Sequence, residues 1–141
     1  KNIVKKRIKS LGIEKLFYFL GSYPSEEMPN FFAHADALLV TLKKTPIFAM
    51  TIPNKIQSYM ACSKPIIASL DGEGRKVILE SKCGYVVPSE DHISLAKTII
   101  KFLELSEKEK EIMGLNGRNF FEKEFEREKQ LDKLIKIFNE R

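Results

Sequence analysis

The sequence predicts an α/β protein with a Rossmann-like, three-layer α/β/α arrangement, a parallel sheet and a helical C-terminal tail. Two observations carry this prediction. Short apolar runs alternate with stretches of helical periodicity as far as residue 88, and only helical periodicity follows. Such alternation calls for right-handed βαβ units, whose strands run parallel. The length of 141 residues is that of one domain, which we expect to span residues 1–141.

Four short apolar runs have the length and residue types of buried strands, at residues 17–21, 37–40, 65–70 and 85–88. In folds of this class, ligands bind outside the carboxyl ends of the strands. Three loops are therefore expected to line a site, and they are Gly21–Pro24, Thr41–Asn54 and Ser69–Gly74.

Helices are expected between and after these runs. Ser25 is a preferred N-cap residue and Pro53 is a residue favoured at a helix start, so a helix is expected from each. A short third helix is expected to stop at Gly84, because glycine ends helices readily. The chain is expected to be helical from Ser89 onward, with further helices around residues 106–123 and 129–141.

Composition and charge limit the class of protein. Hydrophobic residues make up 43% and charged residues 30%, the balance of an ordinary globular domain. No apolar run approaches the roughly 20 residues that cross a bilayer, and the charged start is unlike a secretory signal. The net charge of +5, with Lys and Arg spread along the chain, favours an anionic partner: a nucleotide diphosphate, a nucleic acid or an acidic membrane surface.

Neither cysteine nor histidine carries an obvious chemistry. Cys62 and Cys83 lack metal-ligand spacing and a nearby His, so we expect small buried residues of a reduced, intracellular protein. His34 and His92 are expected to be structural or exposed. No metalloprotease, serine-hydrolase or Cys–His motif occurs, so we assign no general base, no other catalytic residue and no metal site.

The strongest candidate for chemistry is the loop that ends with Thr51, Ile52, Pro53, Asn54 and Lys55. No Asp or Glu occurs between residues 41 and 70, whereas four lysines do. Free backbone N–H groups and the helix dipole make a helix N-terminus an anion site. Plain helix capping beside a solvated lysine is the competing interpretation. The position of this loop at the carboxyl end of a strand favours phosphate binding.

A second loop, Asp71-Gly72-Glu73-Gly74, opens the next expected helix. Its two glycines permit positive φ and a close approach of a ligand to the backbone, although a simple tight turn would use them equally well. The spacing matches neither a dinucleotide-binding fingerprint nor a P-loop, so no such motif is inferred.

Several segments resemble, in order, the C-terminal domain of GT-B glycosyltransferases of family 4 (group 1). They are Phe17–Gly21, Met28–Ala37, Pro53–Ala68 and Gly84–Pro88, followed by a helix that begins near Asp91. The likeness is greatest to the branch that builds capsule, O-antigen and similar surface polysaccharides, which includes transferases for N-acetylated amino sugars. The run from Pro53 to Tyr59 and the loop at residues 71–74 suggest that branch.

The resemblance implies one half of a two-domain enzyme. The N-terminal domain holds a glycan or lipid-linked acceptor, and the C-terminal domain holds a nucleotide-diphosphate sugar, expected to be UDP-linked, without a metal or other cofactor. The implied location is the cytoplasm, and a peripheral place at the inner membrane face is compatible with it. The diphosphate would meet Pro53, Asn54 and Lys55, and the ribose would meet Ser58. The base would meet Gly21, Ser22 and Tyr23, and the sugar would lie near the loop Gly72–Gly74.

The chain also departs from this family. Many members carry two glutamates, where this chain has Met50 and Ser58. The first strand with its basic pair, and the acceptor domain, would lie upstream of Lys1. We therefore expect this piece to be inactive alone, to bind nucleotide weakly and to expose a free sheet edge that could dimerise.

Two other functions remain open at this stage. One is a non-catalytic nucleotide- or nucleic-acid-binding module that uses the net positive charge; the acidic residues after Glu104 argue against it. The other is a different GT-B enzyme, such as a sugar-nucleotide epimerase; the run from Pro53 to Pro65 favours a transferase.

Overall fold

A three-stranded parallel sheet forms the centre of the protein, in a computed structural model that describes residues 2–139. The strands β1 (Leu38–Thr41), β2 (Ile66–Ser69) and β3 (Gly84–Val87) lie side by side in that order. Ile66 pairs with Leu38 on one side and with Gly84 on the other. All four residues of β2 are buried, which explains why its sequence is apolar on both faces.

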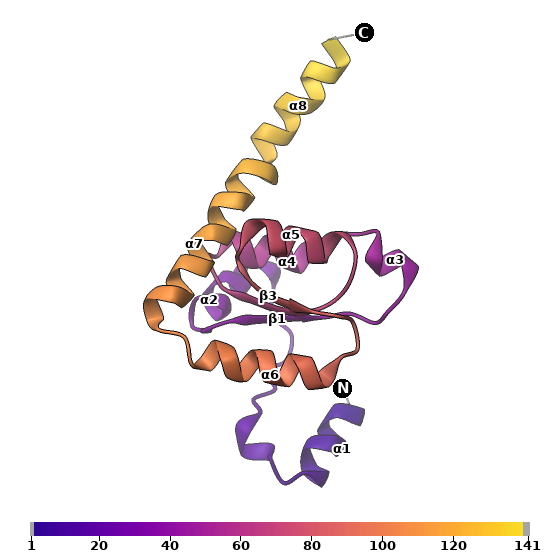
Figure 1. Cartoon of the computed structure of the whole chain (residues 1–141), viewed down its shortest axis with the longest axis vertical. Helices are drawn as coiled ribbons and strands as arrows, with labels where there is room; N and C mark the ends of the chain where they lie inside the picture. The colour runs from indigo at the N-terminus through magenta and orange to yellow at the C-terminus, as the bar shows by residue number, and fades with distance from the viewer. Residues whose placement is uncertain (1, 140–141) are drawn as a thin grey trace.

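Helices cover both faces of this sheet (Figure 1). On one face lie α4 (Asn54–Ala61) and α5 (Glu73–Ser81), each of which connects two neighbouring strands. On the other face lies α6 (His92–Leu103), which begins at the N-cap Asp91, whose carboxylate accepts a hydrogen bond from Ser94 N at 2.9 Å. The predicted three-layer, Rossmann-like fold with a parallel sheet is thereby confirmed.

The hydrophobic core lies between the sheet and the pair α4 and α5. Ile56 and Met60 of α4 and Ile78 of α5 are fully buried there, together with Ile66 and Leu70. Burial of each such side chain contributes roughly 1.5–3 kcal/mol. The apolar residues of α4 therefore lie on its core face.

A helical tail follows the sheet, as predicted. It consists of α7 (Glu107–Glu124), which begins with a capping box between Ser106 and Glu109, and α8 (Arg127–Asn139). Figure 1 shows α8 projecting away from the body, and its apolar residues are exposed. Residues 140 and 141 of that expected helix lie outside the described residues. Within the described part, no helix is long and apolar enough to cross a membrane.

Two glycines let α7 pack closely on the body. A Cβ at Gly114 would lie 2.1 Å from the Ser63 carbonyl oxygen, and one at Gly117 would lie 3.0 Å from the Cβ of Cys83. One helical turn after Gly114, Arg118 Nη1 donates a hydrogen bond to the Ala61 carbonyl oxygen at 2.5 Å. These contacts hold α7 against the C-terminal end of α4.

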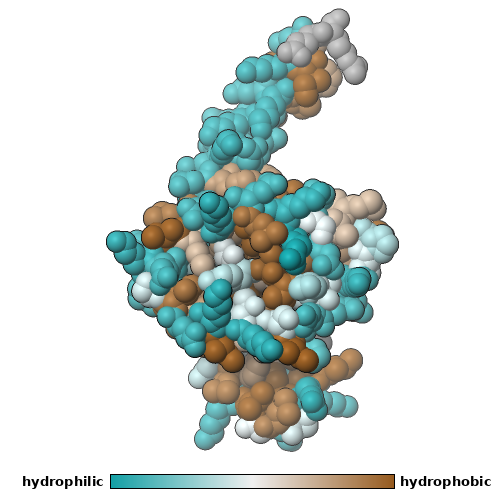
Figure 2. Space-filling view, viewed as in Figure 1, coloured by the Kyte–Doolittle hydropathy of each residue, from teal (hydrophilic) through white to brown (hydrophobic). Residues whose placement is uncertain are grey.

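The N-terminal part of the chain lies below α6 in Figure 1. Figure 2 shows hydrophobic side chains gathered at this end of the molecule. The elements before β1 are α1 (Asn2–Ser10), the 3-10 turns η1 (Glu14–Leu16) and η2 (Ser25–Glu27), and α2 (Met28–Ala33). The short helix α3 (Pro46–Ala49) lies in the long loop that follows β1.

The strand predicted at residues 17–21 is wrong. Phe17 has extended backbone angles, but the segment pairs with none of the three strands and its side chains are exposed. A strand needs hydrogen bonds from a neighbour. An apolar run of this length indicates a preference for extended backbone. Whether a neighbouring strand lies beside it is decided by the tertiary structure.

Two predicted helix ends also differ. Ser25 does not cap α2, because its hydroxyl donates to the Glu26 carboxylate and α2 begins at Met28. Gly84 does not stop α5, which ends at Ser81 and is followed by Lys82 in the left-handed conformation. Gly84 instead starts β3, where a Cβ would overlap the Ile66 carbonyl oxygen. Gly84 therefore allows β3 to lie close to β2, and it does not end a helix.

The two thiols differ in burial, and we predict that they differ in reactivity. Cys83 is fully buried in the core, and this burial raises the pKa of its thiol, whereas Cys62 is only partly buried. Since the thiolate is the reactive form, Ellman's reagent should label Cys62 in the folded chain and Cys83 only after unfolding. The variant Cys62→Ser should lose the labelling seen in the folded chain. Equal rates for the two thiols would contradict the burial of Cys83.

Gly114→Ala should destabilise the protein. Alanine is normally the better helix former by about 1 kcal/mol, but here its methyl group would overlap the Ser63 carbonyl and push α7 off α4. We expect a net loss of about 1–3 kcal/mol in the free energy of unfolding, measured by urea denaturation. Lys108→Ala, at an exposed position of the same helix, is the matched control and should be nearly neutral. A stabilised Gly114→Ala variant would refute this packing.

Candidate functional site

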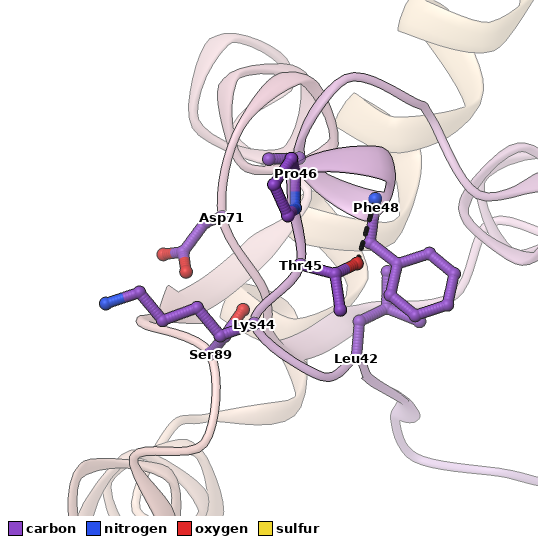
Figure 3. Close-up of a pocket in the computed structure, with 8 residues that line it drawn as sticks. Leu42, Lys44, Thr45, Pro46, Phe48, Asp71 and Ser89 are labelled. Carbon is purple, nitrogen blue, oxygen red and sulfur yellow. Dashed lines mark hydrogen bonds between the residues drawn. The ribbon is translucent and has the colours of Figure 1, made fainter.

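The carboxyl ends of all three strands meet at one edge of the sheet, and a cavity of about 410 Å³ opens there. The segments that follow β1, β2 and β3 each contribute to its wall. Its lining residues are Leu42, Lys44, Thr45, Pro46, Phe48, Ala49, Asp71 and Ser89 (Figure 3). The cavity therefore occupies the place where ligands bind in open α/β sheets.

Local hydrogen bonds hold the long loop after β1 in place. Thr45 Oγ1 accepts a hydrogen bond from Phe48 N at 3.3 Å, the dashed line in Figure 3, and Pro46 occupies the first turn of α3. Lys44 N donates to Glu90 Oε1 at 3.4 Å, which joins this loop to the one after β3. The cavity wall is thus formed by loops that are linked to one another.

The cavity combines an apolar wall with a few polar groups. Leu42, Pro46 and Phe48 supply apolar surface, while the Lys44 ammonium and the Asp71 carboxylate lie on the same side of the opening in Figure 3. A wall of this kind suits a small molecule that has a ring face and hydroxyl groups, because a few placed polar groups orient a ligand in an otherwise apolar pocket.

Two helix N-termini lie next to each other near this edge. No side chain caps α4 or α5, so their first N–H groups lack the usual side-chain acceptor. The two helices touch at Gly74, where a Cβ would lie 3.1 Å from Pro53 Cδ and 3.3 Å from Ile56 Cδ1. A second cavity, of about 300 Å³, has Pro53, Asn54 and Lys55 in its wall together with Leu39–Leu42. Exposed Lys55 adds a positive charge to the two helix dipoles.

The remaining predicted residues of this region take different places. Thr51 Oγ1 donates to the Phe48 carbonyl at 3.4 Å, and Ile52 packs against the core. Ser58 is exposed one turn into α4, where its hydroxyl donates to the Asn54 carbonyl at 3.2 Å. Glu73 forms an exposed ion pair with Lys76 at 2.6 Å. Ser58 is therefore open to solvent on the helix that begins at the second cavity.

Gly72 is where two of the predicted loops touch. Its φ is +71°, and a Cβ would lie 1.8 Å from the Ala49 carbonyl oxygen. Only glycine tolerates both conditions. The sequence suggested either a close approach of a ligand or a simple tight turn at this loop; at Gly72 the group that approaches is the protein's own Ala49 carbonyl.

The first predicted loop does not join the others. Gly21, Ser22 and Tyr23 lie in an exposed segment, and none of them lines either cavity. The Tyr23 ring packs on Phe31, with ring centroids 4.5 Å apart. Because the expected strand before this loop did not form, no sheet edge brings it to the carboxyl ends of β1–β3.

None of the eight residues that line the larger cavity was among the site residues assigned from the sequence, and the polar ones among them are Lys44, Thr45, Asp71 and Ser89. Two signals were available. Lys44, Thr45 and Asp71 fall inside loops already expected at the site, and Ser89 directly follows the fourth predicted strand. Applying the carboxyl-end rule to that strand as well would have included Ser89.

Gly72→Ala should disturb the cavity more than glycine replacement elsewhere. The methyl group would displace the segment Pro46–Ala49, so we expect a loss of about 2 kcal/mol or more in unfolding free energy, together with amide shifts across residues 44–50. Gly12→Ala is the matched control, because its φ of +66° is nearly the same but a Cβ there meets no atom within 4 Å. Equal effects of the two substitutions would show that only backbone strain matters.

Comparison with known proteins identifies the family. The family model described as glycosyl transferases group 1 matches residues 1–120, which is most of the chain. No curated protein and no solved structure matches. The match includes the sheet, both candidate helix N-termini and the loops around the larger cavity. The chain belongs to the group 1 glycosyltransferases.

Proposed function

We propose that this chain is the donor-binding domain of a glycosyltransferase that takes a sugar from a nucleotide-diphosphate donor, UDP-linked, and passes it to a glycan or lipid-linked acceptor in surface polysaccharide biosynthesis. The observation that carries the proposal is the pair of uncapped helix N-termini beside a cavity at the carboxyl edge of the sheet, in a member of this family. No metal or other cofactor takes part in the proposed reaction.

The diphosphate is assigned to the start of α4. Asn54 and Lys55 lie in the wall of the second cavity, and the helix they begin has no side-chain cap. Backbone N–H groups at such an end bind phosphate oxygens well, and the Lys55 ammonium adds a charge-assisted contact. The segment from residue 41 to residue 70 contains no acidic residue that would repel the phosphates.

The transferred sugar is assigned to the larger cavity. Lys44, Asp71 and Ser89 offer donors and acceptors for hydroxyl groups, and Phe48 and Pro46 offer an apolar face. The loop Gly72–Gly74 separates this cavity from the start of α4, since Gly72 touches Ala49 and Gly74 touches Pro53. A donor placed across that loop would have its sugar on one side and its diphosphate on the other.

The chemical role of this half is to stabilise the leaving group. When the bond between the sugar and the diphosphate breaks, negative charge develops on the phosphate oxygen. N–H groups fixed at the helix start and the Lys55 ammonium face that charge without having to rearrange. The ribose of the nucleoside is assigned to Ser58, as the family resemblance implies. Gly21, Ser22 and Tyr23, which the resemblance implies for the base, line neither cavity, so the base is not assigned to them.

Completion of the site requires the remainder of the enzyme. The outer edge of β1 is unpaired in the described structure, and Leu39 on it is 49% exposed. We assign that edge to a further strand of the same enzyme, and the acceptor to its other domain. This chain alone is then inactive, binds nucleotide weakly and can self-associate through the free edge.

The test is a titration of the chain with UDP, GDP, ADP and inorganic phosphate, followed by amide shifts in NMR spectra. UDP should shift the amides of residues 52–58 selectively, because the diphosphate contacts the start of α4. Lys55→Ala should weaken the affinity for UDP about fivefold to tenfold, the equivalent of about 1 kcal/mol. Lys97→Ala, on the exposed side of α6, is the matched control and should leave the affinity unchanged.

The outcome distinguishes the proposal from its rivals. Equal shifts with all nucleotides and with phosphate would reduce the site to a phosphate-binding helix end. Silence from every nucleotide, both here and in a longer polypeptide that supplies the missing strand, would refute donor binding by this domain.

A further inference from the structure

The turn that follows β3 contains a residue in an unfavourable backbone conformation. Glu90 has a φ of +65°, and Asp91 N donates to the Pro88 carbonyl oxygen at 3.3 Å, so residues 88–91 form a β-turn with Glu90 at its third position. A positive φ at that position is the pattern of a type II turn, which favours glycine or asparagine there. Because Glu90 has a longer side chain on its Cβ, this conformation costs free energy that glycine would avoid.

The side chain of Glu90 reaches a loop that is distant in the sequence. Its Oε1 accepts a hydrogen bond from Lys44 N at 3.4 Å, across 46 residues. Among the hydrogen bonds of residues 2–139, this is the one that joins the loop after β1 to the turn after β3. The turn itself is fixed to the end of β2, because Ser69 Oγ donates to the Pro88 carbonyl at 2.9 Å. Glu90 therefore connects the loop to a turn that is already anchored.

The loop around Lys44 has little other support. The larger cavity, of about 410 Å³, borders it at Leu42 and Lys44. Another cavity, of about 210 Å³, borders it at Leu42 and Lys43 and also has Glu90 in its wall. Lys43 and Lys44 are exposed, and Leu42 is only partly buried. Segments with few buried contacts open easily, so one hydrogen bond has a large share in holding this loop.

The hydrogen bond lies beside the wall of the larger cavity. Lys44 and Ser89 both line that cavity, and Ser89 directly precedes Glu90 in the turn (Figure 3). Without this bond, Lys44 could move relative to Ser89 and Asp71. Polar groups that orient a ligand must keep their relative positions, because hydrogen bonds weaken steeply with poor geometry. Backbone strain next to a candidate site points to a role for the strained residue there.

We propose that Glu90 is a positioning residue of the candidate donor site. Its carboxylate holds the Lys44 amide, which keeps the Lys44 side chain at the wall of the larger cavity, and Glu90 itself does not contact the donor. The effect on sugar binding rests on the proposed function, which assigns the sugar to this cavity. The contact between Glu90 and the loop does not depend on that assignment.

Two substitutions separate the role of the side chain from that of the backbone. Glu90→Asn tolerates the positive φ, but its side chain is one methylene shorter and should not reach Lys44 N. Glu90→Gln keeps the length and an acceptor oxygen. Lys82→Asn is the matched control, because Lys82 is exposed and has a φ of +54°, but lies at the opposite end of α5 from Gly72.

The first measurement is the hydrogen-exchange rate of the Lys44 amide, followed by NMR. Glu90→Asn should raise this rate about threefold to tenfold, the range expected for loss of one weak hydrogen bond. Glu90→Gln should stay within about twofold of the wild-type rate, and Lys82→Asn should not change it. Residue 90 is not a sequence neighbour of Lys44, so the intrinsic exchange rate stays the same. The Tm of Glu90→Asn should not fall, because asparagine fits the turn.

The second measurement compares affinities for UDP and for two sugar-bearing probes, UDP-glucose and UDP-N-acetylglucosamine. A probe that binds the wild-type chain more tightly than UDP reports on the sugar. Glu90→Asn should lower the affinity for that probe about threefold to tenfold and leave the affinity for UDP within about twofold. Glu90→Gln should restore the affinity for the probe.

Three results would overturn the proposal. One is an unchanged exchange rate at Lys44 in Glu90→Asn. Another is an unchanged affinity for the sugar-bearing probe despite faster exchange. The third is a lower Tm with faster exchange throughout the sheet, which would make Glu90 a residue of the fold alone. If neither probe binds the wild-type chain more tightly than UDP, the assignment of the sugar to the larger cavity fails, and the exchange rates still decide whether Glu90 holds the loop.

Discussion

The parallel pairing of β2 between β1 and β3 is the constraint on which the rest of the structure depends. Parallel strands must each be followed by a crossover, so α4 and α5 lie on one face and their N-termini point toward the carboxyl edge of the sheet. Full burial of β2 anchors both helices through the same core. The larger cavity, the uncapped helix starts and the three loops come together because of this single arrangement.

Close backbone contacts at three glycines set how near the loops and helices lie to one another. Gly72 brings the loop after β2 against Ala49, and Gly74 brings α5 against Pro53 at the start of α4. Gly114 plays the same role for α7 at a distance from the site. Any side chain larger than hydrogen at Gly72 or Gly114 would overlap a carbonyl group. The candidate site is therefore shaped by the absence of side chains as much as by the polar groups that line it.

The distribution of charge separates two surfaces of the molecule. Lys44 and Lys55 line the two cavities and belong to residues 21–141, which contain 18 basic and 18 acidic residues and therefore carry no net charge. Residues 1–20 hold the excess positive charge, whose influence falls off over about 8 Å at physiological salt.

The sequence by itself determined the fold class, three of its four expected strands, and the helix start at Pro53–Lys55, because periodicity and helix-end chemistry are local properties. It also identified the loops at residues 41–54 and 69–74 that meet at the larger cavity. Tertiary structure decided the rest. Residues 17–21 have the composition of a strand but find no partner, which leaves Gly21–Tyr23 away from the cavities. Gly84 and Gly72 serve contacts with Ile66 and Ala49 that lie far away in the sequence, and no local pattern specifies which backbone will approach a glycine.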